Sequence, residues 1–181
     1  HRLGISNTFN YGSLSFNFLI EYRGGAVVYN QLGNLLDFTG VGSNTTVAGR
    51  QNFVFPNSVT KNSDGTYSPN TSYSTQDGNL VFWTNSPYHT SGYTYVNSAD
   101  FWKLREVVIS YIFPEALLAN TRVFKSLVIG LTGRNLLMWR PKTNVYTDPE
   151  FSLDASNAAG TTNEFQTPPT RIFGLKVTAG F

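Results

Sequence analysis

The sequence predicts an all-β chain, an antiparallel transmembrane β-barrel segment of about five long strands. Apolar residues alternate with small or polar ones through the last eleven residues, up to the terminal Phe181, which is typical of a strand with one apolar and one wet face. Aromatic residues make up 15% of the chain and charged residues only 13%. No stretch approaches the roughly 20 apolar residues of a membrane helix, whereas a transmembrane barrel strand needs only about ten alternating residues.

Composition excludes several classes of function. The 181 residues contain no cysteine, which excludes disulfides, thiolate metal sites and cysteine nucleophiles. The net charge of +2 is too small to indicate a nucleic-acid partner. His1 and His89 are the only histidines and show no metal-ligand spacing, so we expect no metal, no cofactor and no catalytic residues. The chain begins at His1 without a methionine or a signal peptide, which favours a processed chain or a fragment.

The first 23 residues predict a hairpin. Strands are expected over residues 2–11 and 14–23, joined by a tight turn at Gly12 and Ser13. Phe16, Phe18 and Ile20 share the apolar face of the second strand, as lipid-facing residues would. Glu21 and Arg23 share its polar face.

Residues 24–100 show no sustained alternation of apolar and polar residues. A short helical turn is expected near residues 30–38. A loop of this length without secondary structure is uncommon in a compact domain, so it either has a function or contains elements that the pattern does not reveal. Four aromatic residues are candidate contacts for a ligand or for a lid protein: Trp83, Tyr88, Tyr93 and Tyr95. The alternative is that these rings pack within the loop.

Residues 101–113 predict the third long strand. Ile109 and Tyr111 lie on the expected apolar, lipid-facing side. Lys103 and Arg105 fall on that same side near one end, from which their long side chains could reach headgroups or water.

The fourth and fifth strands are expected over residues 126–139 and 170–181, separated by a loop over residues 140–169. Ile129, Leu175 and Val177 are expected on the lipid-facing side. Asp148 and Glu150 could suggest a glycosidase pair, but they are two residues apart beside a proline, which favours a structural turn. Five polar residues are candidate lumen-facing positions, or simply pair with each other within a wet barrel wall: Glu21, Arg23, Glu106, Ser110 and Arg134.

The connections between the five strands alternate short, long, short, long. In barrels of the outer membrane, turns on the periplasmic side are short and loops on the extracellular side are long. The two long loops, over residues 24–100 and 140–169, are therefore expected to be extracellular.

Five stretches resemble motifs of SusC/RagA-type TonB-dependent transporters. Residues 100–114, DFWKLREVVISYIFP, resemble the family's "F-x-R-L-K-N-V-x-L-S-Y-x-L-P", and residues 133–139, GRNLLMW, resemble "G-Q-N-L-F-x-W". Residues 148–150 match "D-P-E", residues 22–25 together with residues 28–30 resemble "R-x-G-G-x-x-Y-N", and residues 168–175 resemble "P-x-x-R-x-x-x-x-G-L". Arg134 replaces the usual Gln, which does not change the assignment.

The resemblance implies the C-terminal part of a plugged outer-membrane barrel of about 22 strands, found in Bacteroidota. It implies TonB-dependent import of oligosaccharides or peptides and no enzymatic activity. The implied partners are the rest of the barrel and its plug, TonB acting through that plug, a SusD-like surface lipoprotein, outer-membrane lipid and lipopolysaccharide. The resemblance also implies that the final strand carries a barrel-assembly signal, which consists of Phe173, Leu175, Val177 and Phe181.

Two other hypotheses are compatible with the alternation alone. One is a secreted β-sandwich module that binds glycans through surface aromatic residues. The other is a small, complete outer-membrane barrel, which the odd number of strands disfavours.

Overall fold

The structure is a computed structural model that describes residues 1–73, 79–119, 123–146, 148–150, 160–162, 165, 167 and 169–181. The chain divides into two compact units. The first, here called the sheet unit, comprises His1–Val27, Ser98–Phe151 and Thr167–Phe181. The second, here called the loop unit, comprises Val28–Asn97 and Ser152–Gln166.

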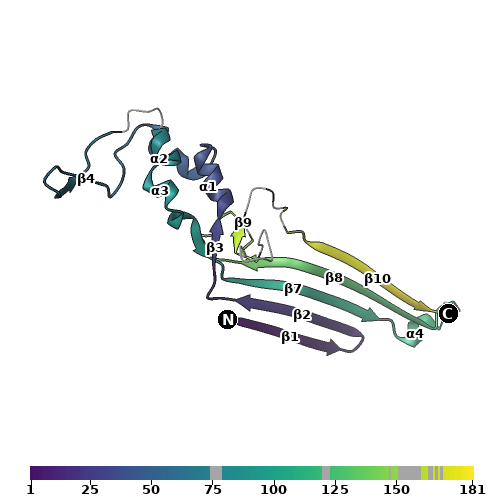
Figure 1. Cartoon of the computed structure of the whole chain (residues 1–181). Helices are drawn as coiled ribbons and strands as arrows, with labels where there is room; N and C mark the ends of the chain where they lie inside the picture. Colours follow the sequence, from purple (N-terminus) through teal and green to yellow (C-terminus); the bar gives the residue numbers. More distant parts are fainter. Residues whose placement is uncertain are drawn as a thin grey trace. The chain divides into compact units, whose positions relative to one another are not determined.

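The sheet unit contains one five-stranded sheet in which every neighbouring pair is antiparallel. Its order is β1-β2-β7-β8-β10, so that long strands adjacent in sequence are also adjacent in space (Figure 1). β1 (Arg2–Tyr11) and β10 (Ile172–Gly180) are the two edges, and the sheet that this chain forms is open. Between them lie β2 (Leu14–Arg23), β7 (Phe101–Ile112) and β8 (Ser126–Trp139).

The all-β antiparallel prediction is confirmed, and the five strands lie close to their predicted positions. β1, β2 and β8 have the predicted bounds, whereas β7 ends one residue before the predicted limit. β10 begins two residues later than predicted and ends one residue earlier. Gly12, in the turn between β1 and β2, has a φ of +56°, a conformation that glycine adopts without steric cost.

Each strand presents apolar side chains on one side of the sheet, here called the apolar face, and mainly polar ones on the other, here called the polar face. Cross-strand partners lie on the same face, so the register assigns each residue. Phe16 is opposite Phe9 and Ile109, and Leu131 is opposite Ile109 and Leu175. Ring centroids of Phe9, Phe16 and Phe18 lie 5.9–6.3 Å apart on the apolar face.

A β-bulge interrupts β7 at Arg105. Leu19 pairs with Glu106 whereas Ile20 pairs with Leu104, so Arg105 is an extra residue relative to β2. Across an extra residue, the facing of the side chains is reversed relative to strict period-two counting. On the N-terminal side of Arg105, Leu104 and Trp102 therefore lie on the apolar face and Lys103 on the polar face. A second register shift follows on β8, where Asn135 has a φ of +53°.

The bulge overturns the expected position of Lys103 and Arg105 on the apolar side. Strict period-two counting placed both cations there, because counting cannot detect an inserted residue. The register instead puts Lys103 opposite Glu21 and Trp102 opposite Tyr22. The rings of Tyr22 and Trp102 have centroids 4.7 Å apart.

The described part of the connection from β7 to β8 includes a short helix, α4 (Glu115–Leu118), which follows Pro114. The Leu118 side chain of this turn is buried. No described helix is both long enough and apolar enough to span a membrane.

The loop unit has secondary structure of its own, so the region that lacks alternation is not structureless. Its strands include β3 (Val27–Asn30), which lies between β6 (Val96–Ser98) and β9 (Thr161–Thr162), and a small hairpin formed by β4 (Val59–Lys61) and β5 (Tyr67–Pro69). Among its described residues, the helical elements include α1 (Gln31–Phe38), α2 (Leu80–Thr84), α3 (Pro87–Thr90) and the 3₁₀ segments η1 (Ser43–Arg50) and η3 (Tyr93–Tyr95).

Local sequence explains α1, which agrees with the helical turn expected near residues 30–38. The Asn30 side chain accepts a hydrogen bond from the Gly33 N–H at 3.0 Å and so caps the helix N-terminus. The apolar core of the loop unit is small and largely aromatic, with Val28, Phe82, Trp83 and Tyr95 buried.

Candidate functional site

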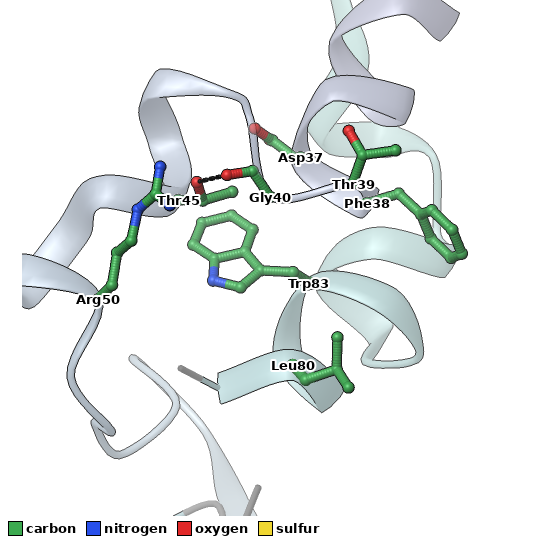
Figure 2. A pocket seen from close by; sticks show the side chains of 8 residues that line it. All are labelled: Asp37, Phe38, Thr39, Gly40, Thr45, Arg50, Leu80 and Trp83. Atoms are coloured by element: carbon green, nitrogen blue, oxygen red, sulfur yellow. Dashed lines mark hydrogen bonds between the residues drawn. The ribbon is translucent and has the colours of Figure 1, made fainter. Parts of the chain in front are cut away.

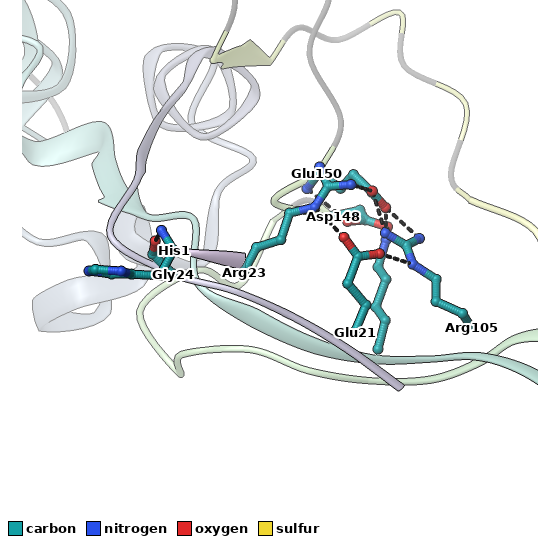
Figure 3. Close-up of polar contacts among 8 residues, drawn as sticks. His1, Glu21, Arg23, Gly24, Arg105, Asp148 and Glu150 are labelled. Carbon is teal, nitrogen blue, oxygen red and sulfur yellow. Dashed lines mark hydrogen bonds and ion pairs between the residues drawn. The ribbon is translucent and has the colours of Figure 1, made fainter. Parts of the chain in front are cut away.

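A cluster of three cations and three anions lies at one end of the polar face, around the β7 bulge (Figure 3). β2 and β7 supply four of its members, and a short segment before the last strand supplies the other two. We call it the charge cluster; its members are Glu21, Arg23, Lys103, Arg105, Asp148 and Glu150.

Lys103 and Asp148 form the buried part of the cluster, with side chains that are 6% and 4% exposed. The Lys103 ammonium donates to Asp148 Oδ2 at 2.5 Å and to Glu150 Oε2 at 2.8 Å. The Asp148 Oδ1 atom accepts the Glu150 backbone N–H at 2.9 Å, which holds the two carboxylates side by side. Buried charges are tolerated when they are paired in this way.

Two arginines complete the cluster around Glu150 and Glu21. The Arg105 guanidinium donates through both terminal nitrogens to the Glu150 carboxylate, one bond being 2.7 Å, and through Nε to Glu21 at 2.6 Å. Arg23 bonds Glu21 at 2.6 Å and lies 3.0 Å from Glu150. The two-nitrogen contact from Arg105 has the fork geometry that suits a carboxylate.

The Phe101 ring lies beneath these cations. Its centroid is 5.1 Å from Lys103 Nζ, 5.7 Å from the guanidinium carbon of Arg23 and 5.8 Å from that of Arg105. The ring itself is buried. Cations within about 6 Å of an aromatic face are attracted by its quadrupole, so Phe101 helps to hold them on the polar face.

The surroundings of Glu150 strongly favour its charged form. Partial burial alone would raise the pKa of the Glu150 carboxyl, but hydrogen bonds from Arg105 and Lys103 and their positive charges outweigh it, and they lower the pKa to about 2. The Glu150 carboxylate is therefore charged at neutral pH. All of its cations and anions are paired with one another, which favours a positioning role for the cluster over proton transfer.

All five candidate lumen-facing residues lie on the polar face, although only Glu21 and Arg23 join the charge cluster. Glu106 and Arg134 are cross-strand neighbours whose charged atoms lie 3.7 Å apart, and this partly exposed pair contributes little stability. Ser110 is opposite Ser15 and Gly130. That this face lines a lumen stays a prediction.

The interpretation of residues 148–150 as a structural turn is compatible with the Asp148–Glu150 hydrogen bond, but it missed the cations that hold the turn. The sequence contained only part of the information needed to predict these contacts. Lys103 and Arg105 stood out as charges in an apolar strand, but their partners lie 45 residues or more along the chain. No local pattern connects the two stretches.

The four candidate contact rings occupy different environments in the loop unit. Trp83 is 6% exposed and Tyr95 is 2% exposed, so both pack within the core. The Tyr95 hydroxyl donates to Asp37 Oδ2 at 3.1 Å. Tyr88 is half-buried and stacks on Phe82 with a centroid distance of 4.7 Å, whereas Tyr93 is 84% exposed.

Described residues of the loop unit form two cavities that adjoin Trp83. One, of about 210 Å³, lies between Trp83, Thr45 and Arg50, with Asp37 and Leu80 also in its lining (Figure 2). The other, of about 700 Å³, is mainly apolar and is lined by the rings of Phe53, Phe82, Trp83 and Tyr88, with aliphatic and small polar residues of η1. The sequence indicated Trp83 and Tyr88 but not Phe53 or Phe82, since residues 24–100 offered no period from which to predict facing.

No site for a metal is formed by His, Asp or Glu side chains in the described parts of the chain.

The assembly-signal residues lie at the edge strand. Phe173, Leu175 and Val177 are on the apolar face and are exposed, each opposite a β8 residue of the same face. The Phe181 ring follows the end of β10 and lies 5.4 Å from the Phe124 ring. Whether an assembly machinery recognises these residues stays a prediction.

Comparison with known proteins reveals similarity in structure only. No family model matches the sequence, and no curated protein matches it. The structure of the RagAB peptide importer in the "open-open" state matches with a TM-score of 0.61 and 18% identity, over 99% of this chain and 17% of that one. The same importer in the "closed-closed" state gives a TM-score of 0.58 and 16% identity, over 97% of this chain and 17% of that one.

A third match, the structure of the RagAB peptide transporter, has a TM-score of 0.57 and 17% identity, over 99% of this chain and 16% of that one. The chain thus spans 16–17% of the length of these structures. Identities this low show the fold alone. At the level of the fold, the chain resembles one part of the RagAB peptide importer structures.

Proposed function

We propose that this chain is a C-terminal wall segment of a TonB-dependent outer-membrane importer of the SusC/RagA type. The apolar face would contact lipid and the polar face would line the lumen. The protein would bind and translocate a nutrient rather than catalyse a reaction, so its charged residues would have structural or binding roles.

The observation that carries this proposal is the exposure of the apolar face. Phe9 is 55% exposed, Leu131 is 56% exposed and Leu175 is 68% exposed, and the three lie on one face of the sheet. A continuous apolar surface of this kind needs lipid or a partner to cover it. In a soluble β-sandwich the same side chains would be buried against a second sheet, so their exposure disfavours the glycan-binding module.

Aromatic side chains at both ends of the apolar face support a membrane location. At the end that carries the charge cluster, Tyr22, Trp102 and Trp139 lie on three adjacent strands. At the opposite end, Tyr111 and Tyr11 lie on that face close to the β1–β2 turn. Bands of aromatic residues at the two interfaces flank the apolar belt of outer-membrane barrels.

The transported substrate is proposed to be a peptide or an oligosaccharide. Similarity of fold to a peptide importer makes peptides the first class to test. A SusD-like lipoprotein is the proposed lid on the extracellular side, the exposed Tyr93 is a candidate contact in the loop unit, and TonB would act through the plug of the complete transporter.

Uptake by the complete transporter tests the proposal. A strain that lacks the gene should fail to accumulate labelled peptides or oligosaccharides of at least one class, and the gene should restore accumulation only when TonB is active. A fractionation of the same cells should place the protein in the detergent-extracted outer membrane. Recovery in the soluble fraction, or uptake that is independent of TonB, would refute the proposal.

A further inference from the structure

The segment of residues 148–150 is bound to two strands through side chains that are distant in sequence. Asp148 and Glu150 contact Lys103 and Arg105 of β7, and Glu150 also contacts Arg23 of β2. Pro149, between the two carboxylates, has a fixed φ and is buried. The segment therefore reaches its partners in a conformation that is already restricted.

Detaching this segment would be strongly unfavourable. It would leave the buried Lys103 without either carboxylate and would leave Arg23 and Arg105 with Glu21 alone. Three cations that lie around the single Phe101 ring would then repel one another. Breaking a buried ion pair by removing one partner is costly because the remaining charge is uncompensated.

We propose that the charge cluster is a permanent anchor, in which Asp148 and Glu150 are positioning residues that hold residues 148–150 on the polar face. The anchor stays closed throughout the working cycle, so this part of the loop is a fixed piece of the wall and does not act as a gate. The β7 bulge is what makes the anchor possible, because it brings Lys103 to the polar face. The anchor is a property of the wall itself and goes beyond the proposed import function. Labelling in resting cells tests it without reference to the substrate that is carried.

Thiol labelling tests the anchor directly, because this chain contains no cysteine of its own. In a complete transporter made free of other cysteines, Pro149→Cys reports on the buried segment and Val145→Cys on an exposed position of the same loop. We expect a membrane-impermeant maleimide to label position 149 much more slowly than position 145. The rate at 149 should be the same in resting cells and in cells that are importing peptide.

Weakening the anchor should release the segment. Adding Glu150→Ala or Asp148→Ala to the Pro149→Cys protein should raise its labelling rate on the order of tenfold or more. Adding Glu106→Gln, which removes a carboxylate of the same face outside the cluster, should leave the rate unchanged. Only molecules that remain folded and inserted are scored, so loss of folding does not count as release.

Hydrogen exchange of the protein without the cysteine substitution provides a second measurement. The Glu150 N–H, which donates to Asp148, should be protected in the parent and should exchange faster in the Asp148→Ala protein. Two results would overturn the proposal. Labelling at 149 that rises during import would make the segment a gate, and unchanged labelling and exchange in both carboxylate variants would show that the cluster does not hold it.

Discussion

The Nζ atom of Lys103 lies 2.5 Å from Oδ2 of Asp148, although 45 residues separate the two in the chain. Both side chains are almost fully buried, so neither charge can be solvated if the other is removed. The pair connects the bulged part of β7 to residues 148–150, and it contributes to stability only as a pair.

Removal of one member of this pair should therefore be much worse than removal of both. Asp148→Ala should lower the free energy of unfolding by an amount near the lower end of about 3–5 kcal/mol, because Glu150 still pairs with Lys103. The apolar double variant Lys103→Met/Asp148→Leu should lose much less. The loss of heat resistance of the inserted protein measures both effects. Equal losses in the single and double variants would contradict a coupled pair.

The pH dependence of stability should reflect Glu150. Its pKa is lowered from 4.5 to about 2 in the folded protein, so between these values the unfolded chain binds the proton first. The stability that Glu150 contributes is complete above about pH 4.5 and is lost progressively as the pH falls toward 2. Heat resistance measured between pH 6 and 2.5 should fall less steeply in Glu150→Gln than in the parent. Parallel curves for the two proteins would exclude Glu150 as the source of the pH dependence.

Two aromatic residues of the loop unit should differ in what their loss affects. Trp83→Ala removes a buried ring and should destabilise the loop unit by about 3–5 kcal/mol, seen as faster proteolysis within residues 28–97. Tyr93→Ala removes an exposed ring and should leave proteolysis unchanged while it reduces uptake or binding of the lid protein. If the Tyr93 variant imports normally, this residue is not a ligand or lid contact.

The terminal ring should matter more for assembly than for the finished protein. Phe181→Ser removes a side chain that contacts only Phe124 among the ring pairs of the described residues. The loss should cost at most the usual aromatic burial, roughly 1.5–3 kcal/mol. We expect less inserted protein in membrane fractions, while the inserted molecules retain near-normal heat resistance. A parental amount of inserted protein would remove the assembly-signal interpretation.

Period-two alternation predicted the sheet because each long strand has one apolar face, and that constraint extends over ten residues or more. It placed β1, β2 and β8 at their observed bounds. It failed at Lys103 and Arg105, because a bulge changes the facing of a strand without changing its composition. Apart from the helical turn at α1, the loop unit was not predicted, since its helices are four to eight residues long and its core depends on contacts between distant rings such as Phe53 and Phe82.

The charge cluster could not be predicted from the sequence either. Glu21 and Arg23 were identified from the polar face of β2, and Asp148 and Glu150 from a turn, but no sequence rule joined them. Their meeting depends on the order β2-β7-β8 and on the register at the bulge. A tertiary arrangement of this kind cannot be read from spacing along one chain.

The most direct test of the membrane-wall account compares two adjacent positions of β2. A fluorophore attached to Cys at position 18, on the apolar face, should be quenched by brominated lipid, and one at position 17, on the polar face, should be quenched by an aqueous quencher instead. Phe18 and Asn17 are adjacent in the strand and point to opposite faces of the sheet. The two positions lie at nearly the same depth in the membrane, so a difference in quenching reports which face each one occupies. Equal quenching of both positions by lipid, or aqueous quenching at position 18, would contradict the account.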